Sequence, residues 1–152
     1  MDYAREEGLN NVLLSLGGNI SCIGTRIDGT NFRLGIQNPD MDSEEQYIEM
    51  VDISDGECVV SSGDYQRYYE VDGVRYCHII DPKTLFPSNE FAAVSVITDD
   101  SGLADSYSTA LYTMSLEEGQ EFVAERDNVE AMWVMHDGTK IYSENFKEKY
   151  VR

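Results

Sequence analysis

The feature that most constrains the fold is a series of short apolar segments separated by turn-forming pairs rich in glycine and aspartate. Short segments of this kind are typical of β-strands, and pairs that tolerate positive φ are typical of hairpin turns. Asp72-Gly73 is the strongest hairpin signal, and Asp137-Gly138 predicts a second hairpin. A turn at Asp28-Gly29 is expected to join two neighbouring strands, and the run 11–16, closed by Gly17-Gly18, is expected to be a buried strand. Strands are predicted over residues 11–16, 20–23, 32–36, 46–53, 58–60, 65–71, 74–80, 91–98, 129–135 and 139–142.

Helices are predicted after residue 98. The segment Asp99-Asp100-Ser101 supplies capping side chains for a helix over 103–114. Ser115 and Glu118 have the spacing of a capping box for a helix over 116–126, and Ser143 is a candidate cap for a short helix at the C-terminus. The apolar face of the first helix is expected to comprise Leu103, Tyr107, Ala110, Leu111 and Met114. Together these signals predict one α+β domain over 1–152, with a mostly antiparallel sheet and packed helices.

The charge balance excludes several classes of partner. The chain has 29 Asp and Glu residues against 11 Lys and Arg residues, so its formal net charge is −18. Nucleic-acid binding needs a basic stripe, which the scattered cations do not form, and contact with an anionic membrane surface is disfavoured for the same reason. No apolar run is long enough to span a bilayer. A phosphate-bearing substrate would need a divalent cation to offset this charge.

The three cysteines carry no metal or redox signal. Cys22, Cys58 and Cys77 are odd in number and show no C-x-x-C spacing. Each lies in an apolar stretch, so we expect three reduced, buried thiols.

Two clusters contain residue types that can hold a cation or move a proton. Asp105 and Thr109 are four residues apart, which places both side chains on one helix face, and Asp105 is expected in the first turn. Their oxygens suit a hard cation such as Mg²⁺. His78 ends an alternating strand just before a rigid turn, where an imidazole can act as a general base. The other histidine, His136, lies beside a turn and is expected to be exposed and without a role.

Each signal also has a purely structural explanation. Asp105 could be a first-turn acid with Thr109 bonded back into its own helix, and His78 could be a half-buried strand residue. Ser62-Gly63-Asp64-Tyr65 could be a plain turn, or could hold a phosphate or ring edge where glycine permits close approach. Gly17-Gly18-Asn19 is not a dinucleotide fingerprint, because no G-x-G-x-x-G opens a helix there.

The order of these motifs is more specific than any one of them. The chain contains L-G-G-N-I at 16–20, S-G-D-Y-x-R at 62–67, H-I-I-D-P-x-T at 78–84 and A-D-x-x-S-T-A-L at 104–111. In this order the motifs resemble the ApbE family of FAD:protein FMN transferases. The resemblance extends from about Tyr3 to the Asp137-Gly138 turn.

The resemblance implies a reaction and a set of site residues. Members bind FAD and a divalent cation, usually Mg²⁺, release AMP and attach FMN through a phosphoester to a Thr or Ser of a target protein. Asp105 and Thr109 match the family's metal ligands, and His78 is the candidate catalytic base. The residues expected to line the FAD site are Gly18, Asn19, Ser62, Gly63, Tyr65, His78, Asp81 and Thr84.

The resemblance also leaves alternatives open. Family members are longer, and residues 1–8 resemble the end of a helix, so the chain is expected to be a C-terminal portion carrying half a site. It would then expose apolar surface and self-associate. The alternatives are an FAD pyrophosphatase, a truncated flavin-binding fragment without catalysis, and a secreted acidic interaction domain. The family implies the outer face of the cytoplasmic membrane as the location.

Two local comparisons with the family carry further expectations. The family usually has glycine after D-P-x-T, whereas this chain has Leu85, so the loop is expected to be reshaped. Targets carry an acceptor sequence of the form D-[GS]-x-[ST]-[GSA]-[AST]-T. Residues 105–111 are similar to it but end in Leu111, so we interpret them as the metal motif rather than as an acceptor.

Overall fold

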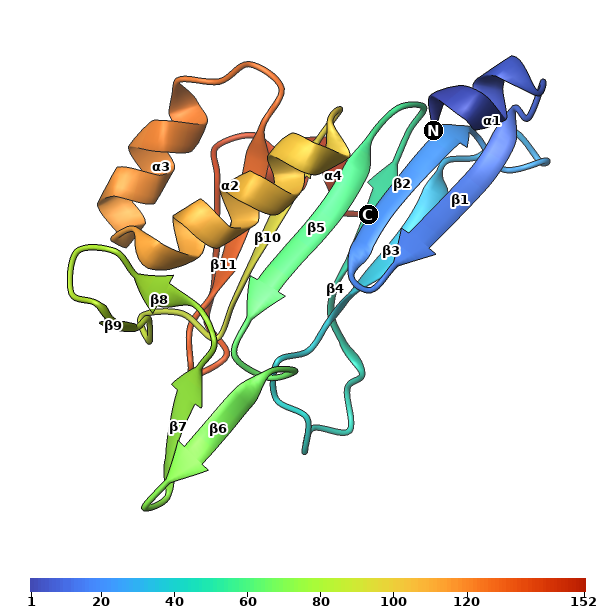
Figure 1. The fold of residues 1–152 in the computed structure, drawn as a ribbon. Coiled ribbons are helices and arrows are strands. Elements are labelled where there is room, and N and C mark those ends of the chain that lie inside the picture. Colours follow the sequence, from blue (N-terminus) through green and yellow to red (C-terminus); the bar gives the residue numbers. More distant parts are fainter.

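The computed structural model describes residues 1–152 and is built around one six-stranded sheet (Figure 1). All neighbouring strands of this sheet run antiparallel. The α+β class with a mostly antiparallel sheet is therefore confirmed. The strands, in spatial order, are β1 (Asn11–Leu16), β2 (Asn19–Gly24), β5 (Cys58–Gly63), β10 (Ala93–Thr98), β11 (Glu130–Val134) and β12 (Lys140–Tyr142).

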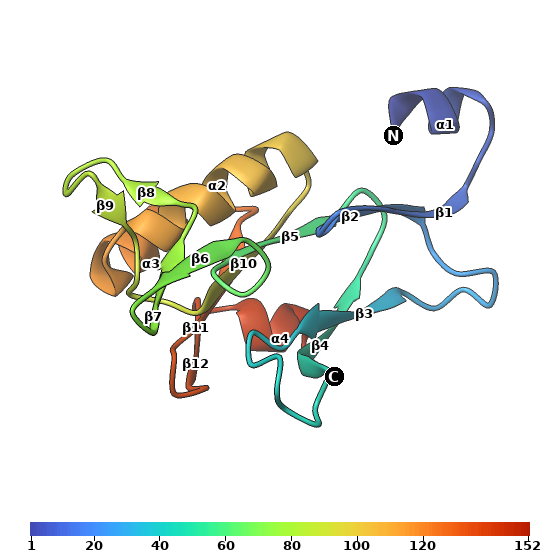
Figure 2. The same ribbon diagram turned by 60° about the horizontal axis from the view of Figure 1, so that its bottom comes forward.

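Elements pack on both faces of the sheet, which makes three layers (Figure 2). Helices α2 (Ser101–Thr113) and α3 (Leu116–Ala124) cover one face. The two-stranded sheet of β3 (Phe32–Gln37) and β4 (Tyr47–Ile53) covers the other, together with α4 (Phe146–Tyr150).

The central strand β10 shows how the two cores form. All six of its residues are buried. Val94 and Val96 join the core beneath α2 and α3, whereas Ala93 and Ile97 join the core shared with β3, β4 and α4. Because side chains alternate along a strand, one buried apolar run can supply both cores.

Three small elements complete the fold. The hairpin of β6 (Tyr68–Val71) and β7 (Val74–Cys77) turns at Asp72 and Gly73, whose φ values of 53° and 78° are those a type I′ turn needs. A second short ribbon pairs β8 (Ile80–Asp81) with β9 (Phe86–Pro87). Helix α1 (Asp2–Glu6) precedes β1.

Several sequence predictions are corrected by the packing. β1 is an edge strand with only one half-buried residue, so the prediction of a buried strand was wrong. The strands on either side of Asp28-Gly29 lie in different sheets. Leu103 is exposed, so the predicted apolar face of α2 was wrong at this residue. Leu111 of that face is buried, Tyr107 and Met114 pack against the core, and α2 also buries Ala104, Ser108 and Tyr112. Ser143 does not cap α4, because its hydroxyl bonds to the Glu130 carboxylate.

The predictions for the cysteines and for the cap of α2 are confirmed. Cys22, Cys58 and Cys77 are free and buried, and burial raises the pKa of the Cys22 and Cys58 thiols to about 11. No helix has the length and apolar character required to cross a lipid bilayer. Asp100 caps α2, accepting hydrogen bonds from the backbone N–H groups of Gly102 and Leu103.

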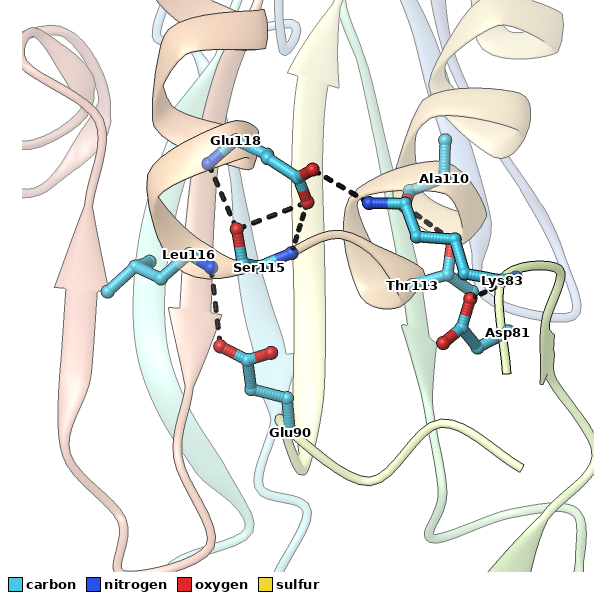
Figure 3. A network of polar contacts seen from close by, with 8 residues as sticks. All are labelled: Asp81, Lys83, Glu90, Ala110, Thr113, Ser115, Leu116 and Glu118. Carbon is cyan, nitrogen blue, oxygen red and sulfur yellow. Dashed lines mark hydrogen bonds and ion pairs between the residues drawn. The ribbon is translucent and has the colours of Figure 1, made fainter. Parts of the chain in front are cut away.

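The capping box of α3 also anchors the β8–β9 ribbon (Figure 3). Ser115 accepts from the N–H of Glu118, and the Glu118 carboxylate accepts from the N–H of Ser115. The same carboxylate accepts from Lys83 Nζ at 2.7 Å, and Glu90 accepts from the N–H of Leu116. The helix start is thus tied to two loops next to it.

This network predicts an acid-sensitive contribution to stability. The Lys83 ammonium and then the N–H and hydroxyl of Ser115 lower the pKa of Glu118 to about 2 from its ordinary 4.5. A carboxyl whose pKa is lowered by folding stabilises the fold above its ordinary pKa, and this stabilisation is lost as the pH falls through the folded value. We expect Glu118→Gln, which can keep the box, to flatten the fall in melting temperature between pH 4.5 and about 2. Glu121→Gln, at an exposed site on α3, is the control and should melt like the wild type. If the melting temperatures of Glu118→Gln and the wild type fall equally with pH, the Glu118 carboxylate is not the source of the acid sensitivity.

The edge strand β1 predicts association of the isolated chain. Leu13, Leu14 and Leu16 are 43%, 41% and 67% exposed, and the outer edge of β1 has no partner strand. Unpaired apolar edges are templates for contact with other chains. We expect light scattering after size exclusion to show mass rising with concentration, and Leu13→Lys to suppress the rise. Ile27→Lys, at a loop residue that is 95% exposed, is the control. A monomeric profile at every concentration would refute the expectation.

Candidate active site

A cavity of about 810 Å³ lies between the edge of the main sheet and the start of α2. Its wall is formed by β1, the β1–β2 turn, the end of β5, the segments 65–67 and 78–80, and α2. A volume of this size falls in the range of sites that hold small organic ligands, ~300–1,000 Å³. Of the predicted site residues, the structure brings Gly18, Asn19, Ser62, Gly63, Tyr65, His78, Asp105 and Thr109 to this one cavity.

Helix α2 contributes Asp105 and Thr109, both exposed on the cavity wall. Because the helix begins at Ser101, Asp105 lies in the second turn, so the prediction of a first-turn position was wrong. The backbone oxygen of Asp105 accepts from the hydroxyls of Ser108 and Thr109 at 3.1 Å and 3.2 Å. Since the Thr109 proton is used inside the helix, its oxygen lone pairs remain available to a ligand.

β5 brings a third hydroxyl to the same place. Ser62 Oγ lies 2.8 Å from Ser108 Oγ and 3.4 Å from Thr109 Oγ1. Because the Ser108 proton goes to a carbonyl, Ser62 is the donor in the first contact. The Asp105 carboxylate therefore lines the same cavity as two hydroxyl oxygens with free lone pairs, and these donors suit a hard cation that also keeps water or phosphate ligands.

His78 follows β7 and lines the cavity with an exposed ring. Its Nδ1 lies 3.0 Å from the backbone oxygen of Arg67. A carbonyl oxygen only accepts, so this contact places the proton of the neutral ring on Nδ1 and leaves the Nε2 lone pair free. His78 is therefore not the half-buried strand residue of the structural alternative, and it lies just beyond the strand that was predicted to contain it.

The glycine-containing segments position the cavity wall. Gly17 and Gly18 have φ values of 59° and 95°, and they turn β1 into β2 beside the cavity. Asn19 donates from Nδ2 to the backbone oxygen of Ser101 at 3.2 Å, which ties this turn to the start of α2. Tyr65 is buried against Gly63, and burial raises the pKa of its hydroxyl.

Asp81 and Thr84 lie outside the cavity wall. They belong to the β8–β9 turn, where Asp81 accepts from the N–H of Lys83 and Thr84 from the N–H of Phe86. Their expected part in binding FAD stays a prediction. In the same turn Leu85 has φ 60°, a left-handed conformation that favours glycine.

The cavity is nearly free of acidic side chains in a strongly acidic chain. Asp105 is the single carboxylate on its wall, and Arg67 is the single Lys or Arg. The sequence prediction named the S-G-D-Y-x-R motif but did not include its Arg67 among the site residues. The motif itself was the signal that could have identified this cation.

Asp64 of the same motif points to a different site. Its side chain is buried, and Oδ2 lies 4.0 Å from Nδ1 of His136. Burial raises the pKa of the Asp64 carboxyl, against the opposing effect of His136 and Arg75. His136 Nε2 also contacts the backbone oxygen of Asn89 at 3.2 Å. His136 therefore holds structural contacts, although its ring is partly exposed as expected.

Comparison with known proteins identifies similar sequences. The sequence model that describes the ApbE family matches residues 1–133. An FAD:protein FMN transferase of Vibrio cholerae is 37% identical over 152 residues, which cover 96% of this chain and 44% of the relative. One of Escherichia coli K12 is 34% identical over 134 residues, covering 88% of this chain and 37% of the relative. The chain thus spans less than half the length of these curated relatives.

Solved structures show the same architecture. The ApbE protein of Thermotoga maritima superposes with a TM-score of 0.82 at 32% identity, covering 97% of this chain and 48% of that one. The flavin transferase ApbE of Vibrio cholerae superposes with a TM-score of 0.81 at 31% identity, covering 97% of this chain and 47% of that one. Nearly the whole fold described above therefore recurs as one half of each of these proteins.

Proposed function

The chain belongs to the ApbE family, and on that premise we propose that its cavity forms part of a site that transfers FMN from FAD to a protein hydroxyl. One observation carries the proposal: Asp105 and Thr109, Ser62, and His78 come from three distant parts of the chain and line one cavity. Packing of the core does not explain why these residues lie close together, because Asp105, Thr109 and His78 are exposed.

The charge distribution supports an anionic dinucleotide as the ligand. The net charge of −18 repels a pyrophosphate over most of the surface, whereas the cavity wall carries one carboxylate and the guanidinium of Arg67. We propose that Asp105 and Thr109 hold Mg²⁺ there. When bound, the cation would offset the charge of the pyrophosphate oxygens and of the departing AMP.

His78 is the proposed general base. Its Nδ1–H donates to the Arg67 backbone oxygen, which orients the ring and leaves Nε2 as the acceptor. In the proposed step, Nε2 takes the proton of the acceptor Thr or Ser, whose oxygen bonds to the FMN phosphorus as the bond to AMP breaks. A positioned base of this kind contributes ~10²–10⁴-fold to the rate.

The test measures binding and transfer separately on the 152-residue chain. FAD is titrated with and without Mg²⁺ while flavin fluorescence is followed. The chain is then incubated with FAD, Mg²⁺ and a peptide containing the acceptor sequence D-G-A-S-G-A-T. Flavin on the peptide is measured by mass spectrometry and AMP by chromatography. Mg²⁺-dependent quenching together with flavinylated peptide supports the proposal.

The other outcomes separate the alternatives. AMP and FMN without flavinylated peptide would indicate an FAD pyrophosphatase. Quenching without AMP would indicate a flavin-binding portion that lacks catalysis. No quenching at any Mg²⁺ concentration would reject the proposed function for this chain.

A further inference from the structure

An exposed aromatic surface lies on the β6–β7 hairpin, outside the cavity. We define the aromatic face as Tyr69, Val71, Val74 and Tyr76, together with Phe86 of β9. Tyr69 pairs with Tyr76 and Val71 pairs with Val74 across the hairpin, so these side chains share one side of the ribbon. The rings of Tyr69 and Tyr76 stack with centroids 5.5 Å apart, and Phe86 meets Tyr76 edge-on at 6.2 Å.

The core does not explain the apolar character of this face. Tyr69, Val71, Val74 and Phe86 are 56%, 49%, 51% and 62% exposed. The hairpin projects beyond the end of β5, away from both core layers (Figure 1). A two-stranded ribbon has an unpaired backbone edge on each strand. Contiguous exposed apolar side chains of this kind mark interaction sites.

The aromatic face is continuous with the cavity at the base of the hairpin. Arg67 precedes β6 and His78 follows β7, and both line the cavity, as does the exposed Ile80. A polypeptide segment lying along the hairpin would therefore reach the imidazole of His78 at the base of the hairpin. The free edges of β6 and β7 offer backbone groups to such a segment, and alternate side chains would meet the aromatic face.

The local charge favours a polypeptide partner at this face. Residues 65–84 contain Arg67, Arg75 and Lys83 against Glu70, Asp72 and Asp81, so they are neutral in a chain of net charge −18. Arg75 and Glu70 lie on the opposite side of the ribbon, where the Arg75 guanidinium covers the Tyr68 ring at 4.2 Å. The aromatic face itself carries no charge. The acceptor sequence begins with an aspartate, which the acidic remainder of the surface would repel, so the acceptor can approach here.

We infer that the aromatic face docks the acceptor polypeptide, holding the segment next to its reactive Thr or Ser so that the hydroxyl reaches the cavity beside His78. The inference rests on the proposed function for the identity of the partner. A second copy of this chain is the competing occupant.

The test uses a triple variant that keeps the shape of the hairpin. Val71→Thr and Val74→Thr retain β-branched side chains, Phe86→Ser removes the exposed ring, and the Tyr69–Tyr76 stack remains in place. Ile27→Ser, at a 95% exposed loop residue away from the hairpin, is the matched control. The probe is a dye-labelled peptide with the acceptor sequence D-G-A-S-G-A-T and flanking residues on both sides.

The test compares peptide binding and FAD quenching in the wild type and the variants. We expect the triple variant to weaken peptide binding, measured by fluorescence anisotropy, at least tenfold and to raise KM for the peptide similarly. Its FAD quenching should equal that of the wild type. Unchanged peptide affinity in the variant, or no binding by the wild type, would overturn the inference. A shift in oligomeric mass with unchanged peptide affinity would assign the face to a second copy and would also overturn it.

Failure of the proposed function has a different signature. If the wild type shows neither FAD quenching nor AMP release, the proposed flavin chemistry is rejected. The peptide affinities of the wild type and the triple variant would still decide whether the aromatic face is a docking surface.

Discussion

Replacing Asp105 with alanine should abolish the proposed flavin transfer while leaving the fold intact. Asp105 is the single carboxylate on the cavity wall, so the proposed cation loses its one anionic ligand. We expect the rate of AMP release to fall by at least ~10²-fold, because one well-placed electrostatic group in a catalytic site is commonly worth ~10²–10³-fold. The Mg²⁺ dependence of FAD quenching should disappear in the same variant.

Stability and activity can be separated at this position. Asp105 is exposed, and the hydrogen bonds it accepts from Ser108 and Thr109 are made by its backbone oxygen, which alanine retains. The free energy of unfolding should therefore change by less than ~0.5 kcal/mol. Ser106→Ala, at the next residue of α2 and off the cavity wall, is the control and should keep full activity. Mg²⁺-dependent turnover by Asp105→Ala would show that the metal assignment is wrong.

Replacing Gly63 with alanine should damage both the sheet and the site. An added Cβ would lie 2.5 Å from the Tyr65 ring and 2.8 Å from the backbone oxygen of Ala92. Tyr65 is buried in the core and Ala92 belongs to the segment entering β10, so neither can move freely. Overpacking of this kind costs ~1–3 kcal/mol of unfolding free energy, measurable by urea denaturation. FAD affinity should fall too, because the same clash displaces the cavity wall.

Gly102→Ala is the matched control for this prediction. Gly102 lies in the first turn of α2, and its added Cβ would approach only the capping carboxylate of Asp100, at 3.3 Å. Alanine is a better helix former than glycine, so this variant should be at least as stable as the wild type. A Gly63→Ala variant with wild-type stability and FAD affinity would contradict the packing described for the end of β5.

Local signals explain why much of the fold was predictable. A turn such as Asp72-Gly73 needs positive φ at two neighbouring residues, and few residue types adopt it, so the hairpin can be identified from two letters. The capping box of Ser115 and Glu118 is equally local. The strand β10 was predictable from its own short apolar run. That run does not determine which strands pair with it.

The candidate site was predictable in part. The i, i+4 spacing of Asp105 and Thr109 places them on one helix face wherever the helix lies. That His78 and Ser62 would meet them was expected only from the resemblance to a family, because these residues are far apart in the chain. The positions of Asp81 and Thr84 in a separate turn, and of Arg67 on the cavity wall, depend on how the β6–β7 and β8–β9 ribbons leave the sheet.

The sequence by itself determined the elements whose causes lie within a few residues: the hairpin turns, the helix caps and the alternating strands. Only the tertiary structure decided that β1 is an exposed edge, that α2 buries Ala104 and Ser108 rather than Leu103, and that one cavity unites Asp105 with His78. The physical reason is the range of the interactions involved. Turn and cap preferences are set by neighbouring backbone atoms, whereas burial and the meeting of distant side chains depend on which surfaces exclude water together.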